Sequence, residues 1–319
     1  MIFNKYFFER KQMINEMQAI IDGLKIFAGA MEIFRQNDRF TEYLLDGKYI
    51  LRISKSELPE QKKHNRVSTL PFVPKIHMSG TVTVAGQQYH GMLFDYMPGD
   101  DLWSVAPGIT EKGQYDIGKQ IAQFLNELHL ITDNYYDIGH YIPTVPRWKK
   151  TWKEGHFEYA AILKTGISKE DLKPGSQKTI SEAFNYIHAN LDSLEYQAGA
   201  KLLHNDFHPK NIIIREGRLT AVVDWECSQF GEADFELSRL IDWCVYPDNY
   251  LAQTNNLGIL FKTVIENLPI SAIPDIEKRM TIYQLEHEIN QLIWRGKRQE
   301  DERIARINEW LNGKACVFK

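Results

Sequence analysis

The pattern of apolar and polar positions changes near residue 98. Before it, short segments with alternating or β-branched and aromatic residues are separated by turn pairs such as Asp46-Gly47 and Ala85-Gly86. Alternation is typical of half-buried strands, and such pairs are typical of tight hairpins. The pattern predicts a mainly antiparallel sheet, with one helix over residues 60–70 between the third and fourth strands. The predicted strands cover residues 30–36, 39–45, 48–54, 75–86 and 87–97.

Helical spacing dominates after the segment PGDDLW, which begins at Pro98 and is expected to be a hinge. Residues 114–129 carry apolar side chains three and four positions apart, which predicts an amphipathic helix. The apolar face contains Ile117, Ile121, Phe124, Leu125 and Leu128. A second helix is predicted over residues 178–194, and the chain after residue 235 is expected to be helical, most regularly over 279–294. The fold class is therefore α+β, with a small β-rich lobe at 1–96 and a larger, mainly helical lobe at 97–319.

Composition narrows the classes of partner. The chain has 319 residues, of which 43% are hydrophobic and 25% charged, and its formal net charge is −4. This length suits two lobes, and the absence of a basic excess argues against broad nucleic-acid binding. No uncharged run approaches the ~18 residues that span a bilayer, and charged residues interrupt the first apolar segment. We therefore expect a cytoplasmic protein with no membrane partner; nothing in the sequence predicts its oligomeric state.

The stretch HNDFHPKN, residues 204–211, concentrates polar side chains that could carry chemistry. His204 and His208 are four residues apart, which on a helix would suit a zinc site. Pro209 follows His208 directly, and a residue before proline is disfavoured in the α-helical conformation. The zinc hypothesis therefore loses the helix that it needs. A serine hydrolase is not favoured either, because the chain contains no GxSxG motif.

A hairpin is predicted immediately after this stretch. NIII and LTAVVD have the character of strands, and Glu216-Gly217 is the expected turn between them. A two-residue turn would place Asn211 opposite Val222, so that Asp224 lies two residues beyond the partner of Asn211. Such diagonal neighbours are within roughly 7–8 Å. With Asp206 in the loop before the hairpin, the hard oxygen atoms of one amide and two carboxylates would suit Mg²⁺.

These residues resemble a known catalytic loop. His204, Asp206, Asn211 and Asp224 match the kinase pattern of a catalytic loop followed by a metal-binding aspartate. The surrounding HNDFHPKNIII and VVDWE resemble the aminoglycoside phosphotransferase and choline kinase family more than protein kinases. GEADFELSRL, with Asp234, follows almost at once, so there is no room for a long activation loop. The resemblance extends over most of the chain and implies a two-lobed, protein-kinase-like fold.

The resemblance also implies roles for the loop residues. Asp206 would orient the acceptor hydroxyl and take its proton, while Asn211 and Asp224 would hold Mg²⁺ against the nucleotide phosphates. His204 is expected to support the loop. His208 is either a phosphate contact or a structural histidine of the loop, and these alternatives stay open.

In the small lobe, the resemblance implies a cation on the third strand that holds the nucleotide phosphates. Arg52 is the candidate, with Lys48 as the alternative, and Glu60 of the following segment, or Glu57, would pair with it. The backbone of Asp95, Tyr96 and Met97 would contact the purine. The phosphate-covering turn RQNDRF lacks glycine, which leaves ATP and GTP both open as cofactors, with Mg²⁺.

The acceptor site is the least defined part of the sequence. Carboxylates and aromatic side chains after residue 235 could recognise a cationic acceptor. These candidates are Asp242, Trp243, Glu286, Glu288 and Trp294. The expected activity is ATP-dependent phosphoryl transfer to a hydroxyl of a small molecule, with an antibiotic kinase such as an aminoglycoside kinase favoured. The alternatives are a choline-, homoserine- or methylthioribose-kinase-like enzyme, a catalytically silent nucleotide-binding module and, least favoured, a protein kinase.

Overall fold

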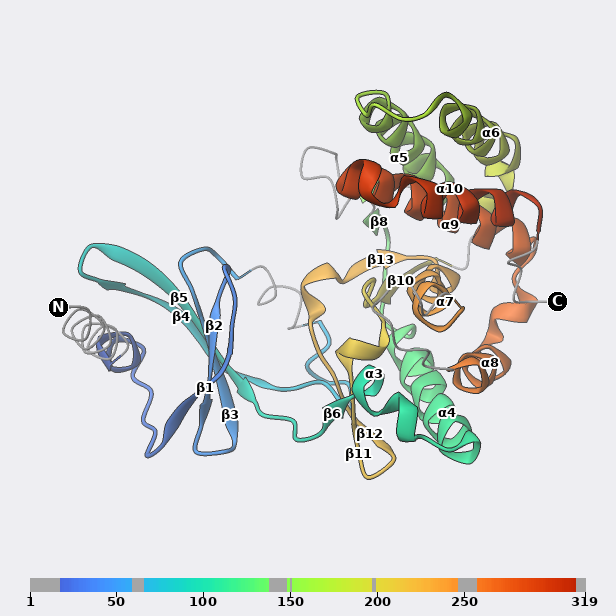
Figure 1. Ribbon diagram of the computed structural model, residues 1–319. Helices are drawn as coiled ribbons and strands as arrows, with labels where there is room; N and C mark the ends of the chain where they lie inside the picture. Colours follow the sequence, from blue (N-terminus) through green and yellow to red (C-terminus); the bar gives the residue numbers. More distant parts are fainter. Residues whose placement is uncertain are drawn as a thin grey trace. The chain divides into compact units, whose positions relative to one another are not determined.

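Figure 1 shows the protein as a computed structural model, and the structure describes residues 18–58, 66–137, 148–149, 151–196, 199–245 and 257–313. Its contacts divide the chain into two compact units. The β-rich unit comprises Met1–Asp101 and Ile212–Glu226, and the helical unit comprises Leu102–Asn211 and Cys227–Lys319. The hairpin that follows HNDFHPKN therefore belongs to the β-rich unit. The assignment of nucleotide binding to residues 1–96 and of catalysis and acceptor binding to residues 97–319 stays a prediction.

A five-stranded antiparallel sheet forms the centre of the β-rich unit, in the order β1-β2-β3-β5-β4. Its strands are β1 (Met31–Gln36), β2 (Thr41–Leu45), β3 (Tyr49–Ser54), β4 (Ile76–Val84) and β5 (Gln87–Asp95). All five predicted strands are thus present, and no strand end differs from its predicted position by more than two residues. Of the predicted helix at 60–70, residues 66–70 form turns, and residues 60–65 lie outside the described part of the chain.

The predicted turn pairs adopt the backbone conformation that tight hairpins require. Asp46 and Gly47 have φ angles of 51° and 64°, and Ala85 and Gly86 have φ angles of 50° and 81°. Positive φ at both central positions matches the right-handed twist of the flanking strands. The carboxylate of Asp46 also accepts the N–H groups of residues 29 and 30. Turn chemistry therefore sets the register of the sheet in the β2–β3 and β4–β5 hairpins.

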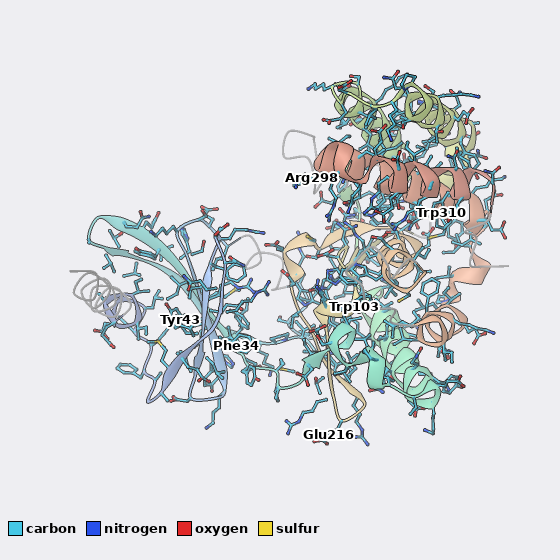
Figure 2. The ribbon with its side chains drawn as sticks, in the orientation of Figure 1. Phe34, Tyr43, Trp103, Glu216, Arg298 and Trp310 are labelled. Atoms are coloured by element: carbon cyan, nitrogen blue, oxygen red, sulfur yellow. The ribbon has the colours of Figure 1, made fainter. Side chains whose placement is uncertain are left out.

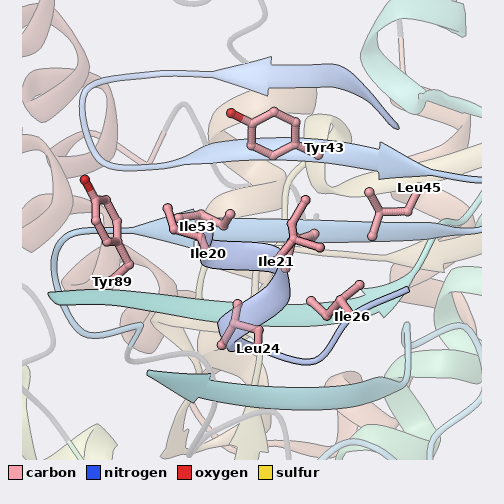
Figure 3. Close-up of a cluster of buried hydrophobic side chains, with 9 residues drawn as sticks. Ile20, Ile21, Leu24, Ile26, Tyr43, Leu45, Ile53 and Tyr89 are labelled. Carbon is pink, nitrogen blue, oxygen red and sulfur yellow. The ribbon is translucent and has the colours of Figure 1, made fainter. Parts of the chain in front are cut away.

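One face of this sheet is covered by the segment that precedes β1. Helical residues 18–23 and the turn after them insert aliphatic side chains between tyrosines and aliphatic residues of β2, β3 and β5 (Figure 3). The cluster consists of Ile20, Ile21, Leu24, Ile26, Tyr43, Leu45, Leu51, Ile53 and Tyr89. Because strand side chains alternate between faces, Arg52 between Leu51 and Ile53 is directed to the opposite face.

The hairpin of β11 (Ile212–Arg215) and β12 (Arg218–Val222) extends a second small sheet with β6 (Asp100–Asp101). Its predicted turn is confirmed, with Glu216 at the tip (Figure 2) and Arg215 opposite Arg218. The predicted register farther along is wrong by one residue. Ile212, not Asn211, pairs with Val222, because Thr220 is an extra residue in β12. A bulge of this kind shifts all pairs beyond it.

The helical unit is built from α-helices, short 3₁₀ turns and small sheets (Figure 1). Its α-helices are α3 (Leu102–Val105), α4 (Glu111–Leu128), α5 (Trp152–Ile167), α6 (Pro174–Asn190), α7 (Leu237–Val245), α8 (Gly258–Glu266), α9 (Ile276–Arg295) and α10 (Glu300–Leu311). Its strands are β7 (Thr132–Asp133), β8 (Tyr136–Asp137), β9 (Trp148–Lys149), β10 (Ala200–Leu203) and β13 (Gln229–Gly231). The 3₁₀ segments are η1 (Ala106–Gly108), η2 (Leu191–Glu195), η3 (Pro209–Asn211), η4 (Trp225–Cys227), η5 (Ala233–Glu236), η7 (Pro269–Ala272) and η8 (Gly296–Gln299). Of these, η4 continues from the β-rich unit, and β10 lies between β13 and β7 in one sheet.

The helices predicted over residues 114–129, 178–194 and after residue 235 are present, whereas α3 and α5 were not predicted. The apolar face expected for α4 is fully buried at all five positions. The helix α5 is absent from the elements predicted from the sequence, although Thr151 and Glu154 form a capping box at its start. That pair is a recognisable start signal, because each side chain accepts an N–H group that the first helical turn leaves without a partner.

Close approach of α4 and α8 depends on Gly118. A Cβ atom at this position would lie 2.9 Å from the backbone oxygen of Leu260 and 2.8 Å from Cβ of Thr263. We expect Gly118→Ala to lower the free energy of unfolding by about 1–3 kcal/mol through overpacking, although alanine is the better helix former. Gly175→Ala on α6, where nothing lies within 4 Å, should leave stability equal or higher. Urea unfolding of both variants tests this, and equal effects would contradict it.

Candidate active site

The loop that carries HNDFHPKN leaves β10 and is anchored by one buried carboxylate. The N–H groups of His204 and Asn205 donate to Glu236 over 2.6 and 2.9 Å. Asn205 is left-handed, with φ of 62°, and its amide donates to the carbonyl oxygen of Cys227. Residues 204–208 are not helical, which agrees with the exclusion of a helical zinc site. The support role predicted for His204 fits its complete burial.

Glu236 is a costly residue to bury. Desolvation raises its pKa to about 7, against the opposing effect of the two N–H groups that it accepts. It lies in η5, two residues after Asp234, which is completely buried with Arg279 of α9. The guanidinium donates to both oxygen atoms of Asp234, over 2.7 and 2.8 Å. The segment GEADFELSRL thus fixes the loop on one side and α9 on the other.

Asp206 lies at the end of this anchor, between cationic and imidazole groups. Nε of Arg239 is 3.9 Å from Oδ1 of Asp206, and Nε2 of His208 is 3.5 Å from Oδ2. Burial alone would raise the pKa of Asp206, but the hydrogen bond and charge of His208, with Arg239 and His204, hold it well below its usual range. Asp206 is therefore ionised at neutral pH while its side chain remains 29% exposed.

Asn211 is oriented by Asp206. Its amide nitrogen donates to the backbone oxygen of Asp206 over 3.0 Å and lies 3.5 Å from Oδ2. Because the amide is planar, this contact directs Oδ1 of Asn211 away from Asp206. The arrangement presents an amide oxygen, which is a hard donor of the kind that Mg²⁺ prefers.

His208 is held by a tryptophan that lies on α7. Its ring stacks on Trp243, with centroids 4.6 Å apart and an angle of 25° between the planes. Trp103, which is labelled in Figure 2, meets the same indole edge to face, with ring centroids 5.1 Å apart. Nδ1 of His208 accepts the N–H of Lys210 over 3.2 Å. Nε2 then faces Asp206, so His208 orients that carboxylate in addition to any contact with phosphate.

In the β-rich unit, Arg52 is buried and bound to Glu42. The two residues lie directly opposite in the β2–β3 register, and Nη2 of Arg52 is 2.6 Å from Oε1 of Glu42. The guanidinium also lies 4.3 Å from the ring centroid of Phe40. Glu42 is not among the predicted partners of Arg52, although cross-strand pairing would have suggested it. Glu60 lies outside the described residues, so its predicted pairing with Arg52 stays a prediction. Its rival Glu57 is exposed.

Arg52 and Asp224 line the same small cavity, of about 40 Å³. Its other lining residues are Pro74, Ile76, Met92, Phe94, Val223 and Trp225. Asp224 has φ of 69°, which is uncommon for a residue other than glycine. The carboxylate of Asp224 and the amide oxygen of Asn211 are hard oxygen donors, and no cysteine lies beside either in sequence. As a donor set they fit Mg²⁺.

The predicted purine-binding backbone is partly engaged within the β-rich unit. The N–H of Asp95 donates to the backbone oxygen of Lys75 over 3.1 Å, and the N–H of Tyr96 donates to the backbone oxygen of Lys48 over 2.8 Å. The carboxylate of Asp95 also lies 2.6 Å from Nε2 of His77. Among the described contacts, the N–H groups of Asp95 and Tyr96 are therefore engaged, and the N–H of Met97 is the one that could bind a purine.

The carboxylates considered for the acceptor site are buried and already have partners within the helical unit. Glu286 lies 2.6 Å from His156, and both side chains are almost fully buried. Glu288 lies 2.9 Å from Arg303, and Asp242 lies 3.5 Å from Arg306. The hypothesis that these three carboxylates face a cationic acceptor is therefore wrong. Trp294, in contrast, is 71% exposed.

Asp242, His287 and Glu288 lie close enough to share a metal ion. Two arginines approach them, however. Nη1 of Arg303 lies 2.9 Å from Glu288, and Nη1 of Arg306 lies 3.5 and 3.6 Å from the carboxylates of Asp242 and Glu288. A guanidinium at this distance already supplies the positive charge, so the cluster is an ion-pair network rather than a metal site.

Family comparison agrees with this arrangement. A model of the phosphotransferase enzyme family matches residues 34–258, which includes every loop and hairpin residue discussed above. The chain belongs to this family. The prediction of a phosphotransferase is thereby confirmed, as is the family resemblance. No helix among the described residues is long and apolar enough to cross a membrane.

Individual proteins resemble this chain at low identity or over a short segment. Hygromycin-B 4-O-kinase of Escherichia coli is 38% identical over 42 residues, which are 13% of this chain and 12% of that enzyme. A thermostable mutant of aminoglycoside phosphotransferase APH(4)-Ia in its apo form has a TM-score of 0.64 at 15% identity, covering 93% of this chain and 98% of that one. The streptomycin-ATP-APH(2")-IIa ternary complex has a TM-score of 0.61 at 18% identity, covering 91% and 95%. These structures confirm the predicted kinase-like α+β fold.

The anchor at Glu236 generates a stability prediction. Glu236→Ala removes the acceptor of two buried N–H groups, so we expect a loss of about 2–4 kcal/mol in the free energy of unfolding. A carboxyl group with a raised folded pKa stabilises most below its unfolded pKa, and that contribution is lost as pH rises toward about 7. The deficit of the variant should therefore be larger at acidic than at alkaline pH.

Guanidinium unfolding at several pH values measures this deficit. The control is Glu266→Ala on α8, where the carboxylate is exposed and paired with Lys262. Its effect should stay within about 0.5 kcal/mol at each pH. A deficit for Glu236→Ala that grows with pH would contradict the assigned shift.

Proposed function

We propose that the protein transfers the γ-phosphoryl group of ATP to a hydroxyl group of a small molecule and requires Mg²⁺. The observation that carries this proposal is the ionised carboxylate of Asp206, partly exposed and fixed beside Asn211. An anchored carboxylate in a loop that ends at an amide ligand is what in-line phosphoryl transfer needs. Activity on ATP also implies a cytoplasmic location, where the nucleotide is abundant.

In the proposed reaction, the acceptor hydroxyl donates a hydrogen bond to Asp206. A bond forms between the hydroxyl oxygen and the γ-phosphorus, and the bond from that phosphorus to the bridging oxygen breaks to release ADP. Because the pKa of Asp206 is held low, the carboxylate is a weak base. It orients the hydroxyl first and takes the proton once bonding to phosphorus has made the hydroxyl acidic.

Asn211 and Asp224 are the proposed ligands of Mg²⁺, which would neutralise charge on the phosphates. Arg52 is the proposed phosphate contact in the β-rich unit. Its pairing with Glu42 and its contact with Phe40 support this role, because both restrict the guanidinium before nucleotide arrives. His208 is proposed to hold Asp206 and to contact phosphate, and the backbone of Asp95, Tyr96 and Met97 to bind the purine. ATP is the proposed donor, with GTP as the alternative.

An aminoglycoside is the favoured acceptor, because the structural neighbours include complexes with hygromycin B and with streptomycin. One observation favours the second candidate, a metabolite kinase. The carboxylates of Asp242, Glu286 and Glu288 are already paired with cationic or imidazole groups. Ammonium groups of an antibiotic would have to find other partners.

An acceptor panel distinguishes these candidates. We expect Mg²⁺-dependent release of ADP with at least one of hygromycin B, gentamicin or streptomycin, and a weaker rate with choline, homoserine or methylthioribose. The measurement is ADP production by the purified full chain, with ATP and then GTP as donor. Turnover confined to the second group would identify a metabolite kinase. Absence of nucleotide binding and turnover with all six would remove the function.

Substitution of Asp206 should lower the turnover rate, whereas substitution of Asp224 should weaken nucleotide binding. Asp206→Asn should lower kcat by about 10²–10⁴-fold, the usual contribution of a general base, with little change in the Kd of Mg²⁺-ATP. Asp224→Ala should raise the Kd of Mg²⁺-ATP and leave that of adenosine unchanged. Calorimetry and steady-state rates supply both readouts. Asp192→Asn, which is 86% exposed, is the control and should match the wild type.

A further inference from the structure

The turn between β1 and β2 is closed by a side chain. Oδ1 of Asn37 accepts the N–H groups of Arg39 and Phe40, over 2.8 and 2.9 Å. The N–H of Asn37 donates back to the carbonyl oxygen of Phe40 over 3.1 Å. The side-chain amide thus stabilises a turn that contains no glycine.

This closure changes what the turn can offer a phosphate group. Glycine-rich loops bind phosphates through backbone N–H groups that point at the ligand. Here the N–H groups of residues 37, 39 and 40 are engaged inside the turn, so that of Asp38 is the one backbone donor of residues 37–40 without a described partner. A phosphate held by this turn would therefore depend mainly on a side chain. Arg39 is the cation at its tip, and 66% of its side chain is exposed.

Arg39 already binds an anion within the β-rich unit. Nη1 and Nη2 lie 3.1 and 2.7 Å from the two oxygen atoms of Glu226, which is the fork-to-fork geometry of arginine with a carboxylate. Glu226 follows the proposed magnesium ligand Asp224 by two residues. Both partners line a hollow of about 650 Å³. The pair therefore joins the turn to the segment where the nucleotide phosphates are proposed to lie.

The pair is open to water on one side. The side chain of Arg39 is 66% exposed and that of Glu226 is 22% exposed, so solvent and salt screen their attraction in part. A nucleoside triphosphate carries more negative charge than one carboxylate and presents several oxygen atoms in the same fork-compatible geometry. Transfer of the guanidinium from Glu226 to a polyphosphate would need no change in the sheet.

We propose that Arg39 binds the terminal phosphates of the nucleotide, and that Glu226 holds this guanidinium until the nucleotide displaces it. This inference rests on the proposed function, since it needs a nucleoside triphosphate as ligand. Arg39 takes the role that backbone N–H groups have in a glycine-rich loop. Glu226 competes with the nucleotide for Arg39, so it lowers the affinity for ATP.

The test compares Kd values for ATP, ADP and adenosine by calorimetry of the full chain, in EDTA and in parallel with Mg²⁺. Arg39→Gln should raise the Kd of ATP about tenfold, the scale of one charge-assisted contact. The effect on ADP should be smaller and that on adenosine absent. Arg39→Lys should keep part of the preference for ATP.

The variant Glu226→Gln tests whether Glu226 competes with the nucleotide for Arg39 or only lies near the bound nucleotide. Without its competitor, Arg39 should bind ATP more tightly, and the Kd in EDTA should fall about threefold. The double variant should behave as Arg39→Gln alone, because Glu226 acts through Arg39. Arg218→Gln at the exposed hairpin end removes the same charge from the same unit and should change nothing.

The outcomes distinguish this inference from the proposed function. If wild type binds ATP and Arg39→Gln leaves its Kd unchanged, the inference is overturned while the function stands. If Glu226→Gln raises the Kd of ATP in EDTA, the proposed transfer of Arg39 from Glu226 to the nucleotide is overturned. If the wild type binds no nucleotide in either condition, both fail. Thermal unfolding of each variant confirms that the fold is intact.

Discussion

The carboxylate of Glu236 is the contact on which the proposed catalytic loop depends. It accepts two successive backbone N–H groups, at His204 and Asn205, and it does so in complete burial. Two backbone groups held by one rigid acceptor leave the loop little freedom. The left-handed conformation of Asn205 turns the chain so that Asp206 emerges toward solvent. A buried acid thereby positions a partly exposed one. The two N–H groups that Glu236 accepts oppose the cost of its burial, and the closed pair of Asp234 and Arg279 ties the same segment to α9.

Much of the fold could be predicted from local physics. Alternation identified the five strands of the β-rich unit, and turn pairs with glycine identified its hairpins, because both signals act over a few residues. The face of α4 was predictable for the same reason. The bulge at Thr220 was not, since either strand of a hairpin can accept an extra residue and neighbouring side chains decide which. The allocation of Ile212–Glu226 to the β-rich unit also depends on pairing with Asp100–Asp101, which is distant in sequence.

The candidate site also has a part that the sequence predicts and a part that it does not. Motif spacing selected Asp206, Asn211 and Asp224, because the chemistry of phosphoryl transfer demands those residue types in that order. It could not select their partners. Arg239 and Trp243 reach the loop from α7, and Glu42 reaches Arg52 across a strand pair. Such contacts join residues that are far apart in the sequence, so a short sequence motif cannot reveal them. The charged residues of α9 illustrate the same limit: their spacing on the helix was visible, but their arginine and histidine partners came from α5 and α10.

The buried charges of α9 constrain how this helix could change over evolution. Glu288 lies in a buried network with Arg303 and Arg306, so altering it alone upsets the balance of charge in that network. Glu286 is bound to His156, and its loss would take a hydrogen-bond partner from a buried imidazole. A second substitution would be needed to compensate either change. Exposed positions near the end of the same helix, such as Trp294, have no such linkage and can vary one at a time. Sequence change along α9 would therefore begin at its exposed end, while its charged interior stays fixed.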